Sequence, residues 1–309
     1  MRFLIGLLAV LVLAILPILA PWTQFVLTIA VAQGFAALGV AILLRAGLIS
    51  LGHAMYVAIG AYTAAFLGSR LGIGDFAALL VVATLVSALA GLVFGLFLIR
   101  YRAIFFAMLN LAVSMVLFSL LSKLYALTGG SDGMRVATPT VFGQILPAAA
   151  FARLLFYVAL ALMIGLGAAV RRYLASPLGH ALSAVQSNEI RLEYLGVPVW
   201  LVLLIAYALS AALAGLGGAI TAAAIGHVEP ELAFWTASGH LVLMAVLGGI
   251  GGIAGPFIGA IFLEVLHNFA VGYAAEAWNM FVGIALLIVI FVLPGGLYGL
   301  IARRREAKI

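Results

Sequence analysis

Long apolar segments separated by short polar turns constrain the fold of this chain more than any other feature. A helix needs about 20 mostly apolar residues to cross a bilayer. Clear segments of this kind lie at residues 3–20, 24–44, 47–67, 76–99, 103–125, 150–170, 199–225 and 278–298. Two shorter ones, 239–250 and 256–272, flank a glycine-rich sequence and form either two short spans or one span with a re-entrant segment. The sequence therefore predicts an all-α fold, a polytopic transmembrane helical bundle of about 10 spans, 8 clear and 2 short.

The composition agrees with a membrane protein. Charged residues make up 8% of the chain, whereas an ordinary soluble domain has about 25%. We therefore expect residues 1–309 to form a single transmembrane domain that contacts the lipid bilayer and no nucleic acid. The sequence has no cysteine, which excludes disulfides and thiolate metal sites.

The positively charged residues predict the orientation of the bundle, because cytoplasmic loops of membrane proteins carry an excess of Lys and Arg. With the N-terminus inside and the spans alternating, the inner side receives 11 of the 15 such residues: Arg2, Arg45, Arg100, Arg102, Arg171, Arg172, Arg191, Arg303, Arg304, Arg305 and Lys308. The outer side receives Arg70, Lys123, Arg135 and Arg153. Both termini and the polar stretch 171–198 are therefore predicted to be cytoplasmic.

That polar stretch, residues 171–198, carries the signals of a capped amphipathic helix. Ser176 suits the N-cap and Pro177 the first helical position. Gly196 suits the residue after the helix, and Pro198 blocks its continuation. Between them, apolar residues recur at helical spacing: Leu178, Leu182, Val185, Leu192 and Leu195. We predict one helix over about 177–195, either a passive interfacial helix or a docking site for a cytoplasmic partner, and its length favours docking.

Small residues recur at the spacing that lets membrane helices approach closely. Ser87, Gly91 and Gly95 run at i, i+4 and i+8, and Ala214 with Gly218 and Gly215 with Ala219 form two offset pairs. These residues indicate either close packing within the chain or a face of a dimer.

Few residues could carry chemistry. Lysine occurs only at 123 and 308, outside any P-loop pattern, so the chain lacks that route to ATP hydrolysis. Glu264 and His267 have a possible metal-ligand spacing, but the other histidines are scattered, so we expect no metal, cofactor or catalytic site. A carboxylate at membrane depth usually faces a bundle interior or a cavity. The polar residues at that depth either join helices by hydrogen bonds or line a translocation pathway: His53, Asn110, Glu264 and His267.

Four motifs, in order along residues 30–300, resemble the LivM-type permease of bacterial branched-chain amino-acid ABC importers. The first is Gly47–Ala54 with Gly60–Tyr62, and the second is Phe105–Met108 followed by Thr128–Gly133. The third is Ser176–Leu182 with Asn188, Glu189 and Gly196, and the fourth is Gly248–Gly251 with Gly255, Pro256 and Leu293–Leu297. The Thr128–Gly133 loop and the Asn188–Glu189 pair favour the LivM type over its LivH-type partner. The chain departs from the family pattern at His180 and Gln186, where the family has Arg.

The resemblance implies a permease subunit that is not itself an enzyme and sits in the bacterial inner membrane. Its implied partners are a LivH-type permease, two cytoplasmic ATP-binding subunits and a periplasmic or extracellular binding protein. The 171–198 loop would be the coupling element, with Ser176, Pro177, Gly179, His180, Gln186, Asn188, Glu189 and Gly196 as its ATPase-coupling residues. An importer of urea or short amides, from the same family, is an alternative. An ion-coupled secondary transporter is a more distant one.

Overall fold

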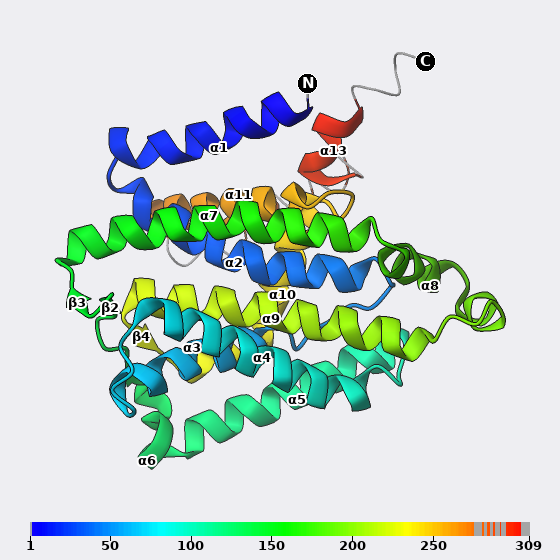
Figure 1. Ribbon diagram of the computed structural model, residues 1–309, viewed down its shortest axis with the longest axis horizontal. Helices are drawn as coiled ribbons and strands as arrows, with labels where there is room; N and C mark the ends of the chain where they lie inside the picture. Colours follow the sequence, from blue (N-terminus) through cyan, green and yellow to red (C-terminus); the bar gives the residue numbers. More distant parts are fainter. Residues whose placement is uncertain are drawn as a thin grey trace.

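The computed structural model describes residues 2–274 and 295–303, with the single residues 280, 283, 284, 287 and 291 between them. The predicted span 278–298 therefore lies largely outside the described residues. Elsewhere the chain is almost entirely helical (Figure 1). The longer helices are α1 (Arg2–Leu19), α2 (Thr23–Leu44), α3 (Ala54–Ser69), α4 (Phe76–Leu98), α5 (Ala103–Lys123), α7 (Ala148–Leu174), α8 (Pro177–Tyr194), α9 (Val199–Ile225), α10 (Trp235–Gly248), α11 (Ala254–Ala274) and α13 (Gly296–Arg303).

Six of the described helices are long and apolar enough to cross a bilayer, namely α2, α4, α5, α7, α9 and α11. Helices α3 and α10 are shorter, at 16 and 14 residues. The prediction of a full span at 47–67 is wrong in its first part. Gly47 takes a left-handed conformation with φ +74°, and the chain becomes helical again only at Ala54.

The glycine-rich sequence between 248 and 256 breaks the helix as predicted. Gly249 ends α10 with a φ of +96°, and α11 begins at Ala254. Two helices therefore occupy residues 235–274. Helix α11, with 21 residues, is longer than the short span predicted at 256–272.

The core of the bundle is built by α9 against α2, α3 and α4, where glycines bring the backbones together. A Cβ atom added to Gly218 would lie 1.9 Å from the carbonyl oxygen of Val57, and one added to Gly60 would lie 2.0 Å from that of Gly215. Ser87 packs on Gly215, and Gly91 packs on Ala211. The small residues that the sequence left open between internal packing and a dimer face therefore serve packing within the chain.

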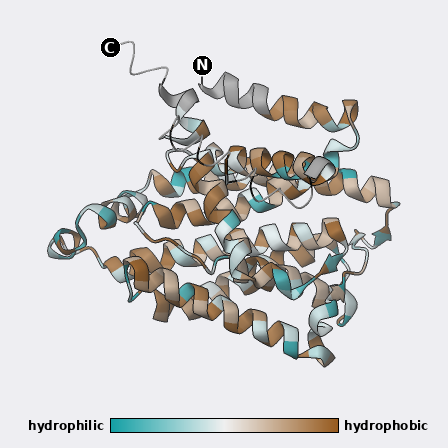
Figure 2. Ribbon diagram, turned by 180° about the vertical axis from the view of Figure 1, so that it is seen from behind, coloured by the Kyte–Doolittle hydropathy of each residue, from teal (hydrophilic) through white to brown (hydrophobic). Residues whose placement is uncertain are grey.

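The polar segments gather at the two ends of the bundle. One end carries β1 (Met134–Arg135) paired antiparallel with β4 (His227–Val228), and the hairpin of β2 (Thr140–Val141) and β3 (Gln144–Ile145). The short helices α6 (Tyr125–Thr128), η1 (Gly130–Asp132) and η2 (Pro230–Ala233) lie in the same connections. Helix α8 lies at the opposite end (Figure 1). Hydrophilic residues are concentrated towards both ends, and hydrophobic residues dominate the helices between them (Figure 2).

Candidate coupling helix and buried polar network

Helix α8 begins where the sequence predicts. The Ser176 hydroxyl accepts a hydrogen bond from the Gly179 backbone N–H at 3.4 Å and donates one to the Tyr173 carbonyl at 2.6 Å. Pro177 occupies the first helical position. Ser176 thereby satisfies one of the free N–H groups that open every helix, and it ties α8 to the end of α7.

Gly179 has a packing role in the turn between α7 and α8. A Cβ atom at this position would lie 2.4 Å from both the Leu174 Cα atom and the Tyr173 carbonyl oxygen. Real Cβ atoms do not approach backbone this closely, so any side chain here would push α8 away from α7. Gly179, which was assigned to the coupling set from the resemblance, therefore fixes the position of α8 and is itself buried.

The prediction of one continuous helix over 177–195 is wrong, because the helix breaks at Asn188. This residue has an extended conformation, with φ −164° and ψ +95°, inside α8. Its Oδ1 atom accepts a hydrogen bond from the Arg191 N–H at 2.9 Å, so Asn188 is the N-cap of a second short segment. That segment ends as predicted, with Gly196 in the left-handed conformation at φ +79°.

The apolar stripe of α8 is most exposed after the break, although Leu192 there packs against the core. Leu182 and Val185, before the break, are buried against the bundle. After the break, Ile190, Tyr194 and Leu195 are 66%, 88% and 73% exposed. These three residues form an exposed apolar tip at the end of the molecule, which we call the α8 tip.

The other predicted coupling residues mostly contact the chain itself. His180 is exposed, with its Nδ1 atom 2.9 Å from the Ser176 carbonyl oxygen, and Gln186 lies against Gly47. Glu189 forms a two-point ion pair with Arg102: Oε1 lies 2.5 Å from Nη2, and Oε2 lies 2.8 Å from Nε. This pair was not predicted, since its members are 87 positions apart in the sequence.

A second cluster of polar residues lies buried between α3, α5 and α9. The Tyr207 hydroxyl donates to Asn110 Oδ1 at 2.5 Å and receives a hydrogen bond from the Tyr56 hydroxyl at 3.1 Å. Ser50 reaches the same Asn110 oxygen at 3.4 Å. His53 Nε2 lies 2.9 Å from the Ser210 hydroxyl. Of these residues, the sequence analysis identified only His53 and Asn110, because single Ser and Tyr residues are common in apolar segments.

These residues are fully buried, so in this conformation the cluster joins helices by hydrogen bonds and lines no open path. Glu264 and His267, the other two predicted pathway residues, are partly buried on α11. That helix packs against α2 and α10, away from the elements that carry the cluster. The structure therefore brings His53 and Asn110 together and places Glu264 and His267 elsewhere. Among the described residues, no three His, Asp or Glu side chains could together hold a metal ion.

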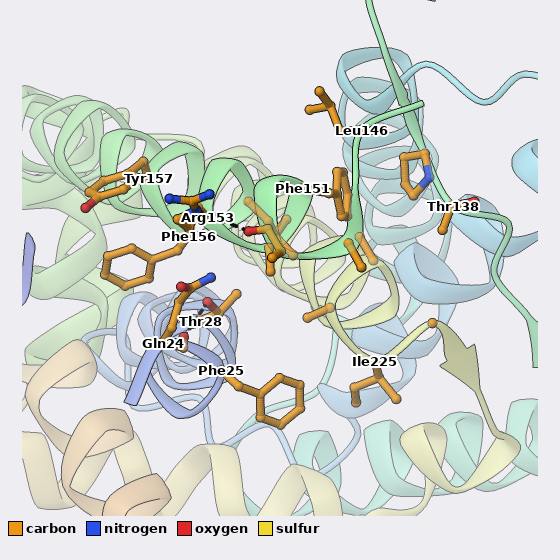
Figure 3. Close-up of a pocket in the computed structure, with 18 of the residues that line it drawn as sticks. Gln24, Phe25, Thr28, Thr138, Leu146, Phe151, Arg153, Phe156, Tyr157 and Ile225 are labelled. Carbon is orange, nitrogen blue, oxygen red and sulfur yellow. Dashed lines mark hydrogen bonds between the residues drawn. The ribbon is translucent and has the colours of Figure 1, made fainter. Parts of the chain in front are cut away.

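Among the cavities that the described residues line, two open into the bundle. The larger has a volume of about 840 Å³ and lies at the β1–β4 end between α2, α7 and the end of α9 (Figure 3). Its walls are mostly apolar, with polar groups from Gln24, Thr28, Arg153 and Tyr157. The smaller, of about 120 Å³, lies among α2, α3, α9 and α10 and is lined in part by Gln33, Thr221 and His240. The bundle thus encloses apolar space with few polar groups.

Known proteins place the chain in a family. The family model described as branched-chain amino acid transport system, permease component, matches residues 22–291. The LivM permease protein of the high-affinity branched-chain amino acid transport system of Salmonella typhimurium is 31% identical over 271 residues, which cover 79% of this chain. The LivM protein of Escherichia coli is 31% identical over 266 residues. The LivH permease protein of Salmonella typhimurium is 31% identical over 125 residues, 40% of this chain.

The match to the LivM proteins covers 62% of their length, so the chain spans less than two thirds of these relatives. No solved structure matches the chain significantly. The resemblance to LivM-type permeases that the sequence motifs indicated is confirmed, because the family model covers nearly all of the described bundle, including α8. The chain belongs to the family of permease components of branched-chain amino acid transport systems.

Proposed function

We propose that this chain is a permease subunit of an ATP-driven importer that moves branched-chain or other hydrophobic amino acids into the cytoplasm. The observation that carries the proposal is the family match over residues 22–291, together with the similarity to LivM proteins. The apolar walls of the larger cavity suit a hydrophobic side chain, and its few polar groups suit a zwitterionic head. His53, Asn110, Glu264 and His267 are proposed pathway residues, with the buried cluster opening only when the bundle changes state.

The energy would come from two cytoplasmic ATP-binding subunits, since the sequence carries no P-loop of its own. A LivH-type permease would complete the pathway, and a periplasmic or extracellular binding protein would deliver the substrate. The α8 tip is the proposed contact for an ATP-binding subunit, because an exposed apolar cluster of this kind marks a protein interaction site.

The orientation follows the distribution of positive charge. The end of the bundle that carries α8 would be cytoplasmic, because Arg45, Arg100, Arg102, Arg171 and Arg172 end or begin helices there. We propose that both chain termini lie on this side, in the inner membrane of a bacterium. In this arrangement the chain forms one permease domain of about 10 spans, with residues 171–198 as its coupling loop.

The test is transport by purified protein in proteoliposomes. The complete complex contains this chain, the second permease, the ATP-binding subunits and the binding protein. It should transport labelled leucine only when ATP is present on the side of the membrane that holds the ATP-binding subunits. If the binding protein binds urea or a short amide and does not bind leucine, the substrate belongs to that class instead. Leucine uptake by this chain alone, driven by a sodium or proton gradient, would contradict the proposal and favour a secondary transporter.

A further inference from the structure

The ion pair between Arg102 and Glu189 joins two elements that are far apart in the sequence. Arg102 stands in the turn between α4 and α5, and Glu189 follows the break in α8. Both side chains are about two-thirds buried. An arginine and a carboxylate that meet through two parallel hydrogen bonds fix each other in direction as well as distance. The pair can therefore carry a displacement from one element to the other.

Arg102 makes two further hydrogen bonds within its own turn. Its Nη1 atom donates to the carbonyl oxygen of Ile99, the C-cap of α4, and to that of Tyr101 in the following turn. One guanidinium group thus joins the end of α4, the start of α5 and the second segment of α8. Arg100, two residues earlier in the same turn, is exposed and has no such contact in the described structure.

The backbone departs from regular geometry beside both members of the pair. Asn188, next to Glu189, is extended within a helix. Ala103, next to Arg102, has φ +50°, in the left-handed region that residues other than glycine rarely adopt. The left-handed conformation of Ala103 persists only where the surroundings enforce it, and such conformations are found at switch regions. The pair therefore lies beside the break in α8 and the left-handed first residue of α5.

The elements also differ in how firmly they are held. The first segment of α8 is fixed to α7 through Gly179 and buries Leu182 and Val185. The second segment, which carries Glu189, ends in the exposed α8 tip. Beyond Arg102, α5 has only 28% of its apolar segment buried, the least of the spans in the bundle except α7. The ion pair thus connects a segment that presents exposed residues to a partner with the sparsely buried helix α5.

We propose that the Arg102–Glu189 pair is the mechanical link by which the second segment of α8 moves α5. Both residues are positioning residues: Glu189 acts on Arg102 inside the chain and is not itself a contact to an ATP-binding subunit. The inference rests on the proposed function, because it assumes that an ATP-binding subunit engages the α8 tip. The inference adds the contact through which binding of an ATP-binding subunit at the α8 tip would move a membrane helix.

The experiment uses the complete reconstituted importer and measures two quantities for each variant: ATP-driven leucine uptake and the amount of ATP-binding subunit that copurifies. Arg102→Ala and Glu189→Gln should each lower uptake about tenfold or more, with copurification unchanged. The charge reversal Arg102→Glu with Glu189→Arg should restore much of the uptake, because it rebuilds the pair. Arg102→Lys keeps the charge but loses the fork, so it should be intermediate and should fold if Arg102→Ala does not.

Matched controls separate loss of the pair from loss of charge. Arg100→Ala and Glu193→Gln remove the same charges from the same turn and the same helix, at exposed positions, and should leave uptake unchanged. The inference is wrong if the single variants take up leucine as fast as the wild type. It is also wrong if Glu189→Gln loses the copurifying ATP-binding subunit and the charge reversal does not restore it. Absence of ATP-driven uptake in the wild-type complex would instead overturn the proposed function.

Discussion

Helices α9 and α5 both pass through the bundle, but they are held by different forces. Helix α9 has 67% of its apolar segment buried, and its neighbour α2 has 94%, against 28% for α5. Backbone-to-backbone contacts at Gly215 and Gly218 lock α9 to α3. Helix α5 buries fewer residues, Phe106 and Leu121 among them, and its backbone approaches another segment closely at Gly52. Hydrogen bonds of the Asn110 and Ser114 side chains add to these contacts. The difference indicates a fixed core around α9 and a movable helix at α5.

The buried hydrogen-bonded cluster at α5, which we call the latch, suits a helix that changes position. Close packing at glycine offers no second arrangement of similar energy, because the contacts fill space completely. A hydrogen bond, in contrast, contributes about 1 kcal/mol net and can be exchanged for another one. The cluster of Tyr56, Tyr207, Asn110 and Ser50 is therefore the contact that we expect to exchange partners when Arg102 moves α5.

The largest expected effect is in the core. Gly218→Leu places a side chain where even a Cβ atom would lie 1.9 Å from the Val57 carbonyl oxygen. The helices must separate, so we expect a loss of about 3 kcal/mol or more in stability, close to failure to fold. Thermal unfolding followed by size-exclusion chromatography in detergent measures it. Gly165→Ala, in open space on α7, is the matched control and should be neutral or stabilising. An unchanged melting temperature in Gly218→Leu would contradict a fixed core.

Tyr207→Phe should loosen α5 while sparing the core. It removes the hydroxyl that donates to Asn110 and leaves the Tyr56 hydroxyl without this partner in a buried site. We expect a cost of about 1–3 kcal/mol. Amide hydrogen exchange should rise in α5 and stay constant in α2. An equal rise in both helices would remove the distinction between core and latch.

Ser114→Ala should have a smaller effect in the same direction. The Ser114 hydroxyl donates to the Ala233 carbonyl at 2.7 Å, which ties the middle of α5 to η2. Its loss should cost about 1 kcal/mol, visible as a lower melting temperature. Ser131→Ala, at an exposed position, is the control and should change nothing. A Ser114→Ala variant as stable as the wild type would mean that the latch is confined to Asn110.

The smallest effect tests the turn before α5, and its sign is informative. Ala103→Gly relieves a left-handed conformation that costs alanine about 1–2 kcal/mol. Part of this gain is offset, because glycine loses more conformational entropy on folding. We expect a small gain in stability, within about 1 kcal/mol. Ala107→Gly, inside the same helix, should lose about 1 kcal/mol. Equal losses at both positions in thermal unfolding would show that Ala103 is not strained.

The sequence predicted those features of the fold that depend on neighbouring residues. Ser176, Pro177 and Gly196 marked the ends of α8, and the glycines at 248–252 marked the break before α11, because caps and left-handed turns depend on neighbouring residues. The break at Asn188 was missed, since an asparagine within a helical pattern becomes a cap only when tertiary contacts favour the second segment. Arg102 and Tyr207 were missed because their roles depend on partners 87 and 97 positions away.

The most direct measurement of the central claim is the distance between α5 and α9 in the two states of the complex. The chain has no cysteine, so spin labels can be placed at single positions without removing any native residue. Labels at Ile104 on α5 and Trp200 on α9, both exposed, report the movement, and labels at Leu96 on α4 and Trp200 report the core. We predict that ATP binding changes the Ile104–Trp200 distance and leaves the Leu96–Trp200 distance constant, and that Arg102→Ala abolishes the change. A fixed Ile104–Trp200 distance in a complex that transports, or the same change in both pairs, would contradict the account.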